Sequence, residues 1–193
     1  ETIDWQIFTQ VCRDANVLAG DDDAFVAINL SARHFSNPRF DQRLLGLLAE
    51  YAVPASRLHV EVTERALLEN TPAVKRILQT FRRAGICISL DDFGTGYSSL
   101  SYLHQYPLQT LKIDRSFVAN LSADAEGSGD AVIRAILAMA ETLSIQVIAE
   151  GVETPQQRDL LRKLGCRRVQ GFLYAKAQPV DTWIRASAPA FPV

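Results

Sequence analysis

The sequence predicts an α/β fold in which parallel strands alternate with helices, and three observations support this. Short apolar runs rich in Val and Ile alternate along the chain with segments of helical periodicity. The runs are apolar nearly throughout, which indicates strands that are covered on both faces. Glycines and a Thr-Pro pair stand where helix caps are expected. The repeated β–α order favours either a doubly wound open sheet or a (β/α)8 barrel.

Each expected strand is brief, and a helical segment separates most of them from the next. The strands are Phe25–Leu30, Leu58–Thr63, Ile86–Leu90, Thr110–Ile113, Gln146–Ala149 and Arg168–Phe172. The expected helices cover 3–18, 39–52, 71–84, 98–105, 130–144 and 155–164. Gly85 and Gly165 follow two of them where a C-cap glycine is favoured, and Thr154–Pro155 supplies an N-cap and a first-turn proline. Six strands are two fewer than a closed barrel contains.

The composition restricts the class of protein. The chain has 193 residues, of which 48% are hydrophobic and 22% charged, as in a globular protein, and we expect a single domain over residues 1–193. The 20 basic residues are balanced by 22 acidic ones, so a nucleic-acid polymer is not the expected partner. The chain contains no transmembrane-length apolar run and does not begin with the pattern of a signal peptide.

The three cysteines indicate a reducing compartment. Cys12, Cys87 and Cys166 are odd in number, widely spaced and set among apolar residues. This pattern predicts reduced core thiols and neither a disulfide framework nor a zinc site. We therefore expect a cytoplasmic domain without direct membrane contact, even if other domains of its parent protein tether it to a membrane.

The first residues suggest that the chain is a piece of a longer protein. Glu1 already lies next to a helical pattern that includes Ile3, Ile7 and Val11. We expect that the start of the domain is missing, which would also account for the two strands that a barrel would lack.

A polar or charged residue stands at or near the end of each expected strand. In parallel α/β folds the C-terminal ends of the strands emerge on one face, where active sites are built. A single Asp at such a place is more often a helix N-cap or a turn residue, and a single Glu can face water. The whole set is harder to explain in this way, because clustered carboxylates raise one another's pKa unless cations hold them ionised. The set is Asn29, Glu61, Asp91, Asp92, Lys112, Asp114, Glu150 and Gln170.

Oxygen atoms are the only ligands that this set offers to a metal ion. Asn29, Glu61, Asp91 and Asp92 carry amide or carboxylate oxygens, and neither His nor Cys joins them. These ligands suit Mg²⁺ or Mn²⁺, allow Ca²⁺ and disfavour zinc. Adjacent Asp91 and Asp92 can direct their carboxylates to opposite sides of the chain, so that two ions could be bridged. Two ions about 3.5–4 Å apart are the usual arrangement for displacement at phosphorus.

A glycine-rich segment follows the two aspartates. Phe93-Gly94-Thr95-Gly96 leads through Tyr97-Ser98-Ser99-Leu100 into a predicted helix. A Gly-Thr-Gly loop by itself is weak evidence for a function. Beside paired aspartates, and before a helix N-terminus that favours anions, it is a candidate lid or coupling loop.

These motifs resemble those of the EAL-domain cyclic-di-GMP phosphodiesterases. The matching stretches occur in family order and span most of the chain, and the DDFGTGYSSL segment is highly specific. They are Asn29-Leu30-Ser31, Glu61-Val62-Thr63-Glu64, Asp91 to Leu100, Leu111-Lys112-Ile113-Asp114, Glu150-Gly151-Val152-Glu153 and Gln170-Gly171-Phe172. The resemblance implies a modified TIM barrel, here without its first strands. It also implies hydrolysis of one phosphodiester of cyclic di-GMP to give linear pGpG.

The resemblance further implies a role for each matching residue. The implied ligands of two Mg²⁺ or Mn²⁺ ions are Asn29, Glu61, Asp91 and Asp92. Lys112 matches the lysine that helps to position the nucleophilic water, and the implied catalytic residues are Lys112, Glu150 and Asp92. The implied substrate-binding residues are Arg33, Asp114, Glu153 and Gln170. A loop that couples dimerisation to catalysis is implied for Glu64, Phe93, Gly94, Thr95 and Gly96.

The sequence departs from the family pattern in two places. The Glu-Ala-Leu segment that names the family, and the arginine after it, would lie before Glu1, and Ala177 stands where the family often has proline. In the family that segment supplies a metal-ligating glutamate and a phosphate-binding arginine. We therefore expect activity from the intact domain and little from residues 1–193 alone.

Three functions follow from these observations. The first is an active phosphodiesterase whose partners are cyclic di-GMP, a second copy of the chain, and sensory or diguanylate cyclase domains of the parent protein. The second is a receptor that binds cyclic di-GMP without cleaving it. The third is a barrel enzyme with another divalent-metal phosphodiester chemistry.

Overall fold

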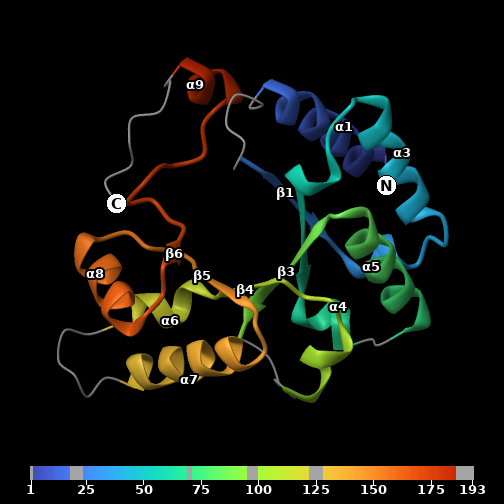
Figure 1. Cartoon of the computed structure of the whole chain (residues 1–193). Helices are drawn as coiled ribbons and strands as arrows, with labels where there is room; N and C mark the ends of the chain where they lie inside the picture. The colour runs from blue at the N-terminus through green and yellow to red at the C-terminus, as the bar shows by residue number, and fades with distance from the viewer. Residues whose placement is uncertain (1, 18–23, 69–70, 95–99, 122–127, 186–193) are drawn as a thin grey trace. The chain divides into compact units, whose positions relative to one another are not determined.

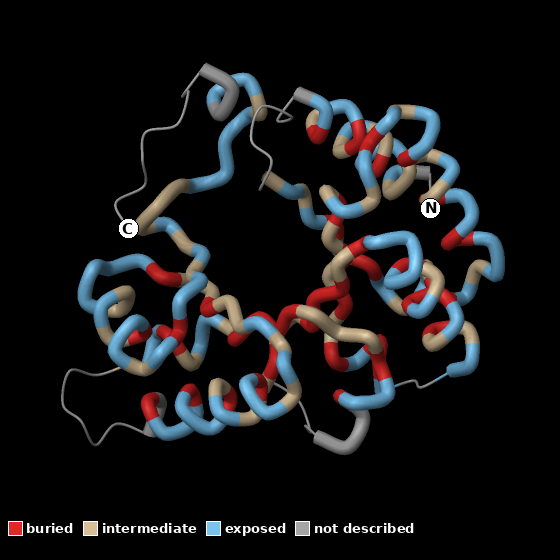
Figure 2. The backbone as a smooth tube through the Cα atoms, in the orientation of Figure 1, coloured by how far each residue is buried: buried red, intermediate tan, exposed pale blue. Residues whose placement is uncertain are grey.

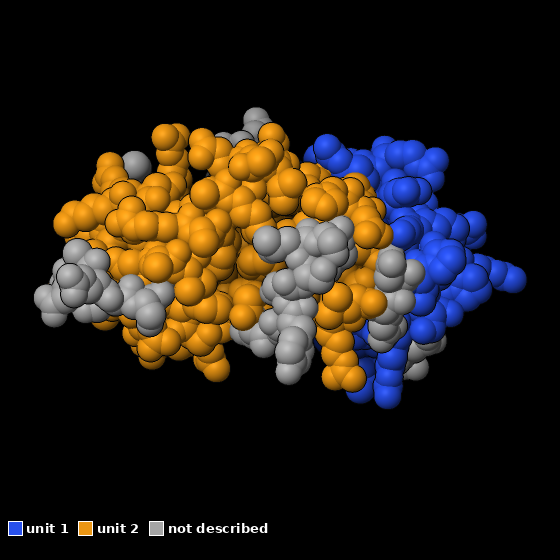
Figure 3. Space-filling view, turned by 90° about the horizontal axis from the view of Figure 1, so that it is seen from below, with its two compact units in different colours: residues 1–62, 69–88, 178–193 blue, residues 63–68, 89–177 orange. Residues whose placement is uncertain are grey.

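The computed structural model describes residues 2–17, 24–68, 71–94, 100–121 and 128–185 (Figure 1). Within them the chain forms an α/β fold with six strands, in which β1 pairs with β2, β3 with β4, β4 with β5 and β5 with β6 in parallel. The chain divides into two compact units (Figure 3). The first comprises residues 1–62, 69–88 and 178–193, and the second comprises 63–68 and 89–177.

The first unit packs helices beside two parallel strands. Its elements are α1 (Thr2–Val17), β1 (Val26–Leu30), α2 (Ala32–Phe35), α3 (Phe40–Glu50), η1 (Ala55–Arg57), nearly all of β2 (Leu58–Thr63), α5 (Pro72–Ala84) and α9 (Val180–Arg185). Phe40 joins α1 to α5, because its ring lies 6.2 Å from that of Phe8 and 6.2 Å from that of Phe81. On β2 the buried residues alternate with partly exposed ones, and Val60 and Val62 are fully buried.

The second unit contains the remaining strands. Its elements are α4 (Glu64–Leu68), most of β3 (Cys87–Phe93), η2 (Leu100–Gln105), β4 (Thr110–Ile113), α6 (Arg115–Ala119), α7 (Ser128–Thr142), β5 (Gln146–Ala149), α8 (Pro155–Leu164) and β6 (Arg168–Val169). In this unit β3 pairs with β4, β4 with β5, and β5 with β6, all in parallel. The four residues of β4 are buried (Figure 2).

The helix caps predicted at Gly85, Thr154 and Gly165 are present, and Thr71 forms a further one. The Thr71 hydroxyl accepts a hydrogen bond from Val74 N at the start of α5, and Gly85 ends that helix with φ +93°. Thr154 and Gln157 form a capping box at the start of α8, which Gly165 ends with φ +96°. Glycine is suited to both C-caps because a positive φ is unfavourable for other L residues.

The strand predictions for β2, β4 and β5 are confirmed residue for residue, whereas three others need correction. β1 starts at Val26, one residue later than expected, and β3 runs from Cys87 through both aspartates to Phe93. β6 has two residues, because the chain turns away after Gln170 and the backbone of Gly171 packs closely on that of Val152. Four short helices within the described residues, α2, α4, α6 and α9, have no apolar period long enough to predict them.

The remaining helix predictions differ mainly at their ends. Within the described residues, 98–105 is a 3₁₀ helix from Leu100 to Gln105, and α7 covers Ser128–Thr142 where 130–144 was expected. No helix in the described ranges has the length and apolar character required to cross a membrane.

Candidate active site

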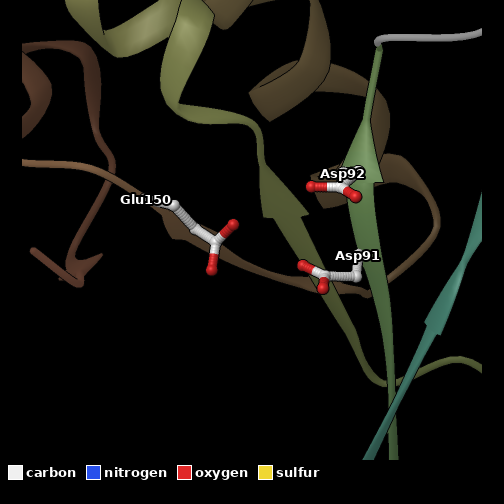
Figure 4. A group of neighbouring side chains, drawn as sticks. All are labelled: Asp91, Asp92 and Glu150. Atoms are coloured by element: carbon white, nitrogen blue, oxygen red, sulfur yellow. The ribbon is translucent and has the colours of Figure 1, made fainter. Parts of the chain in front are cut away.

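An irregularity at the end of β3 brings two adjacent aspartates together. The pairing register with β4 shifts between Leu90 and Phe93, and Asp92 has φ +54°. In a regular strand the two side chains would point to opposite faces, but a bulge and a positive φ rotate one of them. The expectation that their carboxylates point to opposite sides of the chain is therefore wrong. Both point toward the same region (Figure 4).

Glu150 completes a cluster of three carboxylates with these aspartates. It follows β5, and one oxygen from each of Asp91, Asp92 and Glu150 lies within 4.8 Å of the others. The three side chains come from the C-terminal ends of two strands of the second unit and face one another (Figure 4). The prediction that polar residues at strand ends converge is confirmed for these three.

Lys112 provides a buried positive charge beside this cluster. It is 4% exposed on β4, the strand between β3 and β5. Its Nζ lies 2.7 Å from Glu150 Oε1 and 3.1 Å from Asp91 Oδ1. The contact with Asp91 is a charge contact without hydrogen-bond geometry, and Asp91 Oδ1 is a buried oxygen that accepts no hydrogen bond from the described residues. The Lys112 ammonium therefore contacts two of the three carboxylates of the cluster.

The pKa of the Asp92 carboxyl is raised in this acidic cluster. Although Asp92 is exposed, partial desolvation raises the pKa of its carboxyl above its usual value, and the charges of Asp91 and Asp114 raise it further. Lys112 and Arg115 act in the opposite direction without cancelling the rise. The cluster therefore favours a cation, as expected for like charges that share a site.

Asp114 is placed as a helix cap. Its side chain accepts a hydrogen bond of 2.9 Å from Ser116 N at the start of α6. Burial alone would raise the pKa of Asp114, but hydrogen bonds from Ser116 and Arg115 and the charge of Arg115 bring it below the usual value. The N-cap role that a lone Asp after a strand most often has is thus present here.

Asn29 and Glu61 form a second pair in the first unit. They are Cα partners on the paired strands β1 and β2, near the C-terminal end of each. Asn29 is exposed and Glu61 is partly exposed. Their side chains alternate with buried Ile28, Leu30, Val60 and Val62, so both lie on the opposite face from the apolar core.

The other predicted site residues lie in varied environments. Glu64 is the first residue of α4 and is 5% exposed, and Phe93 is buried at the end of β3. Glu153 and Gln170 are exposed, as is Arg33 on α2. Gly94 follows Phe93 with φ +96°, and Thr95 and Gly96 lie outside the described residues.

The donor atoms of this cluster fit a divalent cation of the Mg²⁺ or Mn²⁺ type. Asp91, Asp92 and Glu150 provide carboxylate oxygens close enough to share one ion, and one buried oxygen of Asp91 has no hydrogen-bond donor among the described residues. Oxygen-only ligands are characteristic of these hard cations.

Comparison with known proteins agrees with this geometry. A family model described as the EAL domain matches residues 1–177. The chain belongs to the EAL family. It is 40% identical over 179 residues to the cyclic di-GMP phosphodiesterase NbdA of Pseudomonas aeruginosa, which corresponds to 92% of this chain and 22% of NbdA. The chain therefore spans less than a quarter of the length of this relative.

Solved structures of EAL proteins resemble the chain in the same way. The c-di-GMP complex of the PaMucR phosphodiesterase superimposes with a TM-score of 0.83 at 37% identity, over 93% of this chain and 78% of that chain. The manganese and cy-diGMP complex of BlrP1 from Klebsiella pneumoniae gives a TM-score of 0.76 at 28% identity, over 86% of this chain and 42% of that chain. The predicted family and its TIM-barrel type of fold are thus confirmed for this EAL chain.

Asp92→Asn is expected to stabilise the metal-free protein at neutral pH. The raised pKa means that ionisation of Asp92 costs folding free energy. This cost is absent below the pKa that Asp92 has in the unfolded chain, about 3.9. It reaches its full size above the pKa that Asp92 has in the folded protein. Asn also tolerates the positive φ at this position. Thermal unfolding in chelator should show a higher midpoint for the variant at pH 7, and the difference should shrink toward pH 4.

Asp159→Asn is the matched control for this change. Asp159 is an exposed carboxylate whose pKa is lowered by its hydrogen bond to Arg158, so its replacement removes a weakly favourable charge. Its midpoint should be unchanged or slightly lower at pH 7. A lower midpoint for Asp92→Asn in chelator would contradict the electrostatic argument.

Proposed function

We propose that this EAL protein hydrolyses cyclic di-GMP to linear pGpG in a reaction that requires Mg²⁺ or Mn²⁺. The observation that carries the proposal is the cluster of Asp91, Asp92 and Glu150 beside buried Lys112. The name of NbdA and the ligand in the PaMucR complex support the choice of substrate. The manganese ion in the BlrP1 complex supports the choice of metal.

We propose that Asp91, Asp92, Asn29 and Glu61 hold the metal ions, two in number. When bound, such ions supply positive charge that polarises a phosphodiester and activates water. Glu150 holds the Lys112 ammonium through its 2.7 Å contact. Lys112 in turn directs its charge to the region where negative charge develops on the phosphate and can hold the attacking water by hydrogen bonding.

The proposed substrate contacts come from four further polar residues. We propose that Arg33, Asp114, Glu153 and Gln170 line the substrate site, with Arg33 as the cationic partner for a phosphate. Asp114 also caps α6, so its substitution would disturb both the helix and the site. The proposed assembly is a homodimer, in which Glu64, Phe93, Gly94, Thr95 and Gly96 couple the two subunits to catalysis.

The proposal is tested with the protein in its full natural length. Incubation with cyclic di-GMP and Mn²⁺ or Mg²⁺, followed by nucleotide chromatography, should yield pGpG. An Asp91→Asn, Asp92→Asn double variant should yield none. Tight binding of cyclic di-GMP by the wild-type protein without any pGpG would instead establish the receptor function, in which the acidic cluster serves binding alone.

Glu64→Ala is expected to lower kcat without weakening metal binding. Glu64 lies three residues after Glu61, where the chain leaves β2, and its side chain is buried at the start of α4. We propose that it acts on the loop after β3 and not as a metal ligand. Titration with Mn²⁺ should show the same metal affinity as wild type and no recovery of activity at saturation. Recovery at high Mn²⁺ would make Glu64 a direct ligand.

A further inference from the structure

Helix α6 packs against the turns that follow two of the acidic strand ends. It begins directly after β4, with Asp114 as its N-cap. A methyl group at Gly94 would lie 2.8 Å from Cε2 and 2.9 Å from Cζ of Phe117. A methyl group at Gly151 would overlap Cβ of Arg115. The turn after Asp92 and the turn after Glu150 are therefore both in close contact with the first three residues of α6.

The contact with Phe117 lies two residues beyond Asp92. Gly94 has φ +96°, a conformation that glycine adopts readily, and the Phe117 ring occupies the space that any other side chain would need. Asp92 itself has φ +54°, so two of the three residues from Asp92 to Gly94 have a positive φ, which is an uncommon backbone conformation. This backbone conformation directs both aspartates toward Glu150. A contact that holds Gly94 in place therefore also holds the two carboxylates in place.

The helix that carries Phe117 is firmly attached to the second unit. Val118 is fully buried, and its carbonyl accepts a hydrogen bond of 3.4 Å from Gln157 Nε2 on α8. The Asp114 side chain closes the first turn through Ser116 N. Phe117 is only partly exposed, and its ring is presented by a short helix that has little freedom to shift.

We propose that Phe117 is a positioning residue for the metal ligands. Through its ring contact with Gly94, it keeps the carboxylates of Asp91 and Asp92 within reach of Glu150. This inference rests on the proposed function only in taking these carboxylates as metal ligands. Loss of the ring leaves the strand end free to relax toward a regular course, in which the two aspartates point apart.

The test compares Mn²⁺ affinity with activity in the protein at its full natural length. Electron paramagnetic resonance of free Mn²⁺ gives the affinity, and nucleotide chromatography gives kcat and KM for cyclic di-GMP. Phe117→Ala is expected to weaken Mn²⁺ binding by about 10-fold, the lower end of the effect of residues that support metal ligands. At limiting Mn²⁺, kcat should fall by a similar factor while KM changes little. Phe117→Met, whose side chain can reach as far as the ring edge, should restore most of the affinity.

Val118→Ala is the matched control on the same helix. Its side chain is fully buried, so the variant should unfold at a lower temperature and bind Mn²⁺ as wild type does. Phe117→Ala also removes packed side-chain atoms and should lower the unfolding temperature, but unlike Val118→Ala it should in addition weaken Mn²⁺ binding. A structural role alone would make both measurements move together in both variants.

Gly94→Ala tests the same contact by changing Gly94, the partner of Phe117. Its methyl group collides with Phe117, so it should also weaken Mn²⁺ binding, and the loss in the Gly94→Ala, Phe117→Ala double variant should be smaller than the product of the two single losses. If Phe117→Ala does not fold, Gly94→Ala alone carries the comparison.

The outcomes separate this inference from the proposed function. Unchanged Mn²⁺ affinity in Phe117→Ala, or in Gly94→Ala if that variant carries the comparison, overturns the positioning role and leaves the phosphodiesterase function in place. Fully multiplicative losses in the double variant also overturn it. Wild-type protein that binds Mn²⁺ but releases no pGpG overturns the hydrolytic function, while the affinities still decide the role of Phe117. Wild-type protein that binds no Mn²⁺ overturns both.

Discussion

Lys112→Met is expected to reduce kcat by about 10²- to 10³-fold, the usual cost of removing one preorganised charge or donor from an active site. The buried ammonium group lies between Asp91 and Glu150 and cannot be replaced by water without rearrangement. In the proposed mechanism its charge acts mainly on the attacking water and the developing phosphate charge, so KM should change little. Steady-state assays with cyclic di-GMP at saturating Mn²⁺ measure both constants.

Two variants control this experiment. Lys163→Met removes an exposed lysine of α8 and should leave both kcat and KM unchanged. Lys112→Arg keeps the charge, but its planar guanidinium does not fit a site built for a compact ammonium group, so it should not restore activity. A rise in KM at unchanged kcat in Lys112→Met would show that the lysine captures substrate instead.

Most of the strands could be predicted because each is a short run rich in Val, Ile and Leu with few polar residues. β4 and β5 lie where Thr110–Ile113 and Gln146–Ala149 were expected, since a strand covered on both faces leaves few alternatives in such a run. The grouping of Glu150 with Asp91 follows from the same logic, because parallel strands place their C-terminal ends on one face.

The geometry of the aspartate pair could not be predicted from local sequence. A regular strand would separate Asp91 from Asp92, and the register shift between Leu90 and Phe93 that unites them depends on pairing with β4. The contact between Phe117 and Gly94 could not be predicted from the sequence either, because α6 has five residues and no amphipathic period. The end of β6 was also missed, because the close approach of Gly171 to Val152 is a tertiary contact. For Asp114, the sequence allowed two roles, a helix N-cap and a site residue. The structure shows the N-cap, and the proposed site role would use the same side chain.

Removal of divalent metal is expected to abolish hydrolysis and to lower the stability of the protein. Metal chemistry contributes several kcal/mol to such reactions, so chelation should reduce the rate by at least about 10³-fold. In addition, Asp91, Asp92 and Glu150 bring three carboxylates together, the Lys112 ammonium pairs with two of them, and a bound cation relieves their repulsion. A ligand at 100 times its Kd stabilises the folded state by about 2.7 kcal/mol, which a thermal unfolding assay detects.

Comparison of Mn²⁺, Mg²⁺ and Ca²⁺ makes this prediction specific. All three should raise the unfolding temperature, because each binds oxygen ligands. Mn²⁺ and Mg²⁺ should restore hydrolysis after chelation, whereas Ca²⁺ should restore less, since its larger and looser coordination places water less accurately. Asp92→Asn should lose most of the metal-dependent rise in unfolding temperature, because the variant lacks one of the three clustered carboxylates. Hydrolysis at the full rate in excess chelator would contradict the metal requirement, and an unfolding temperature that none of the three ions raises would contradict the role of the carboxylate cluster.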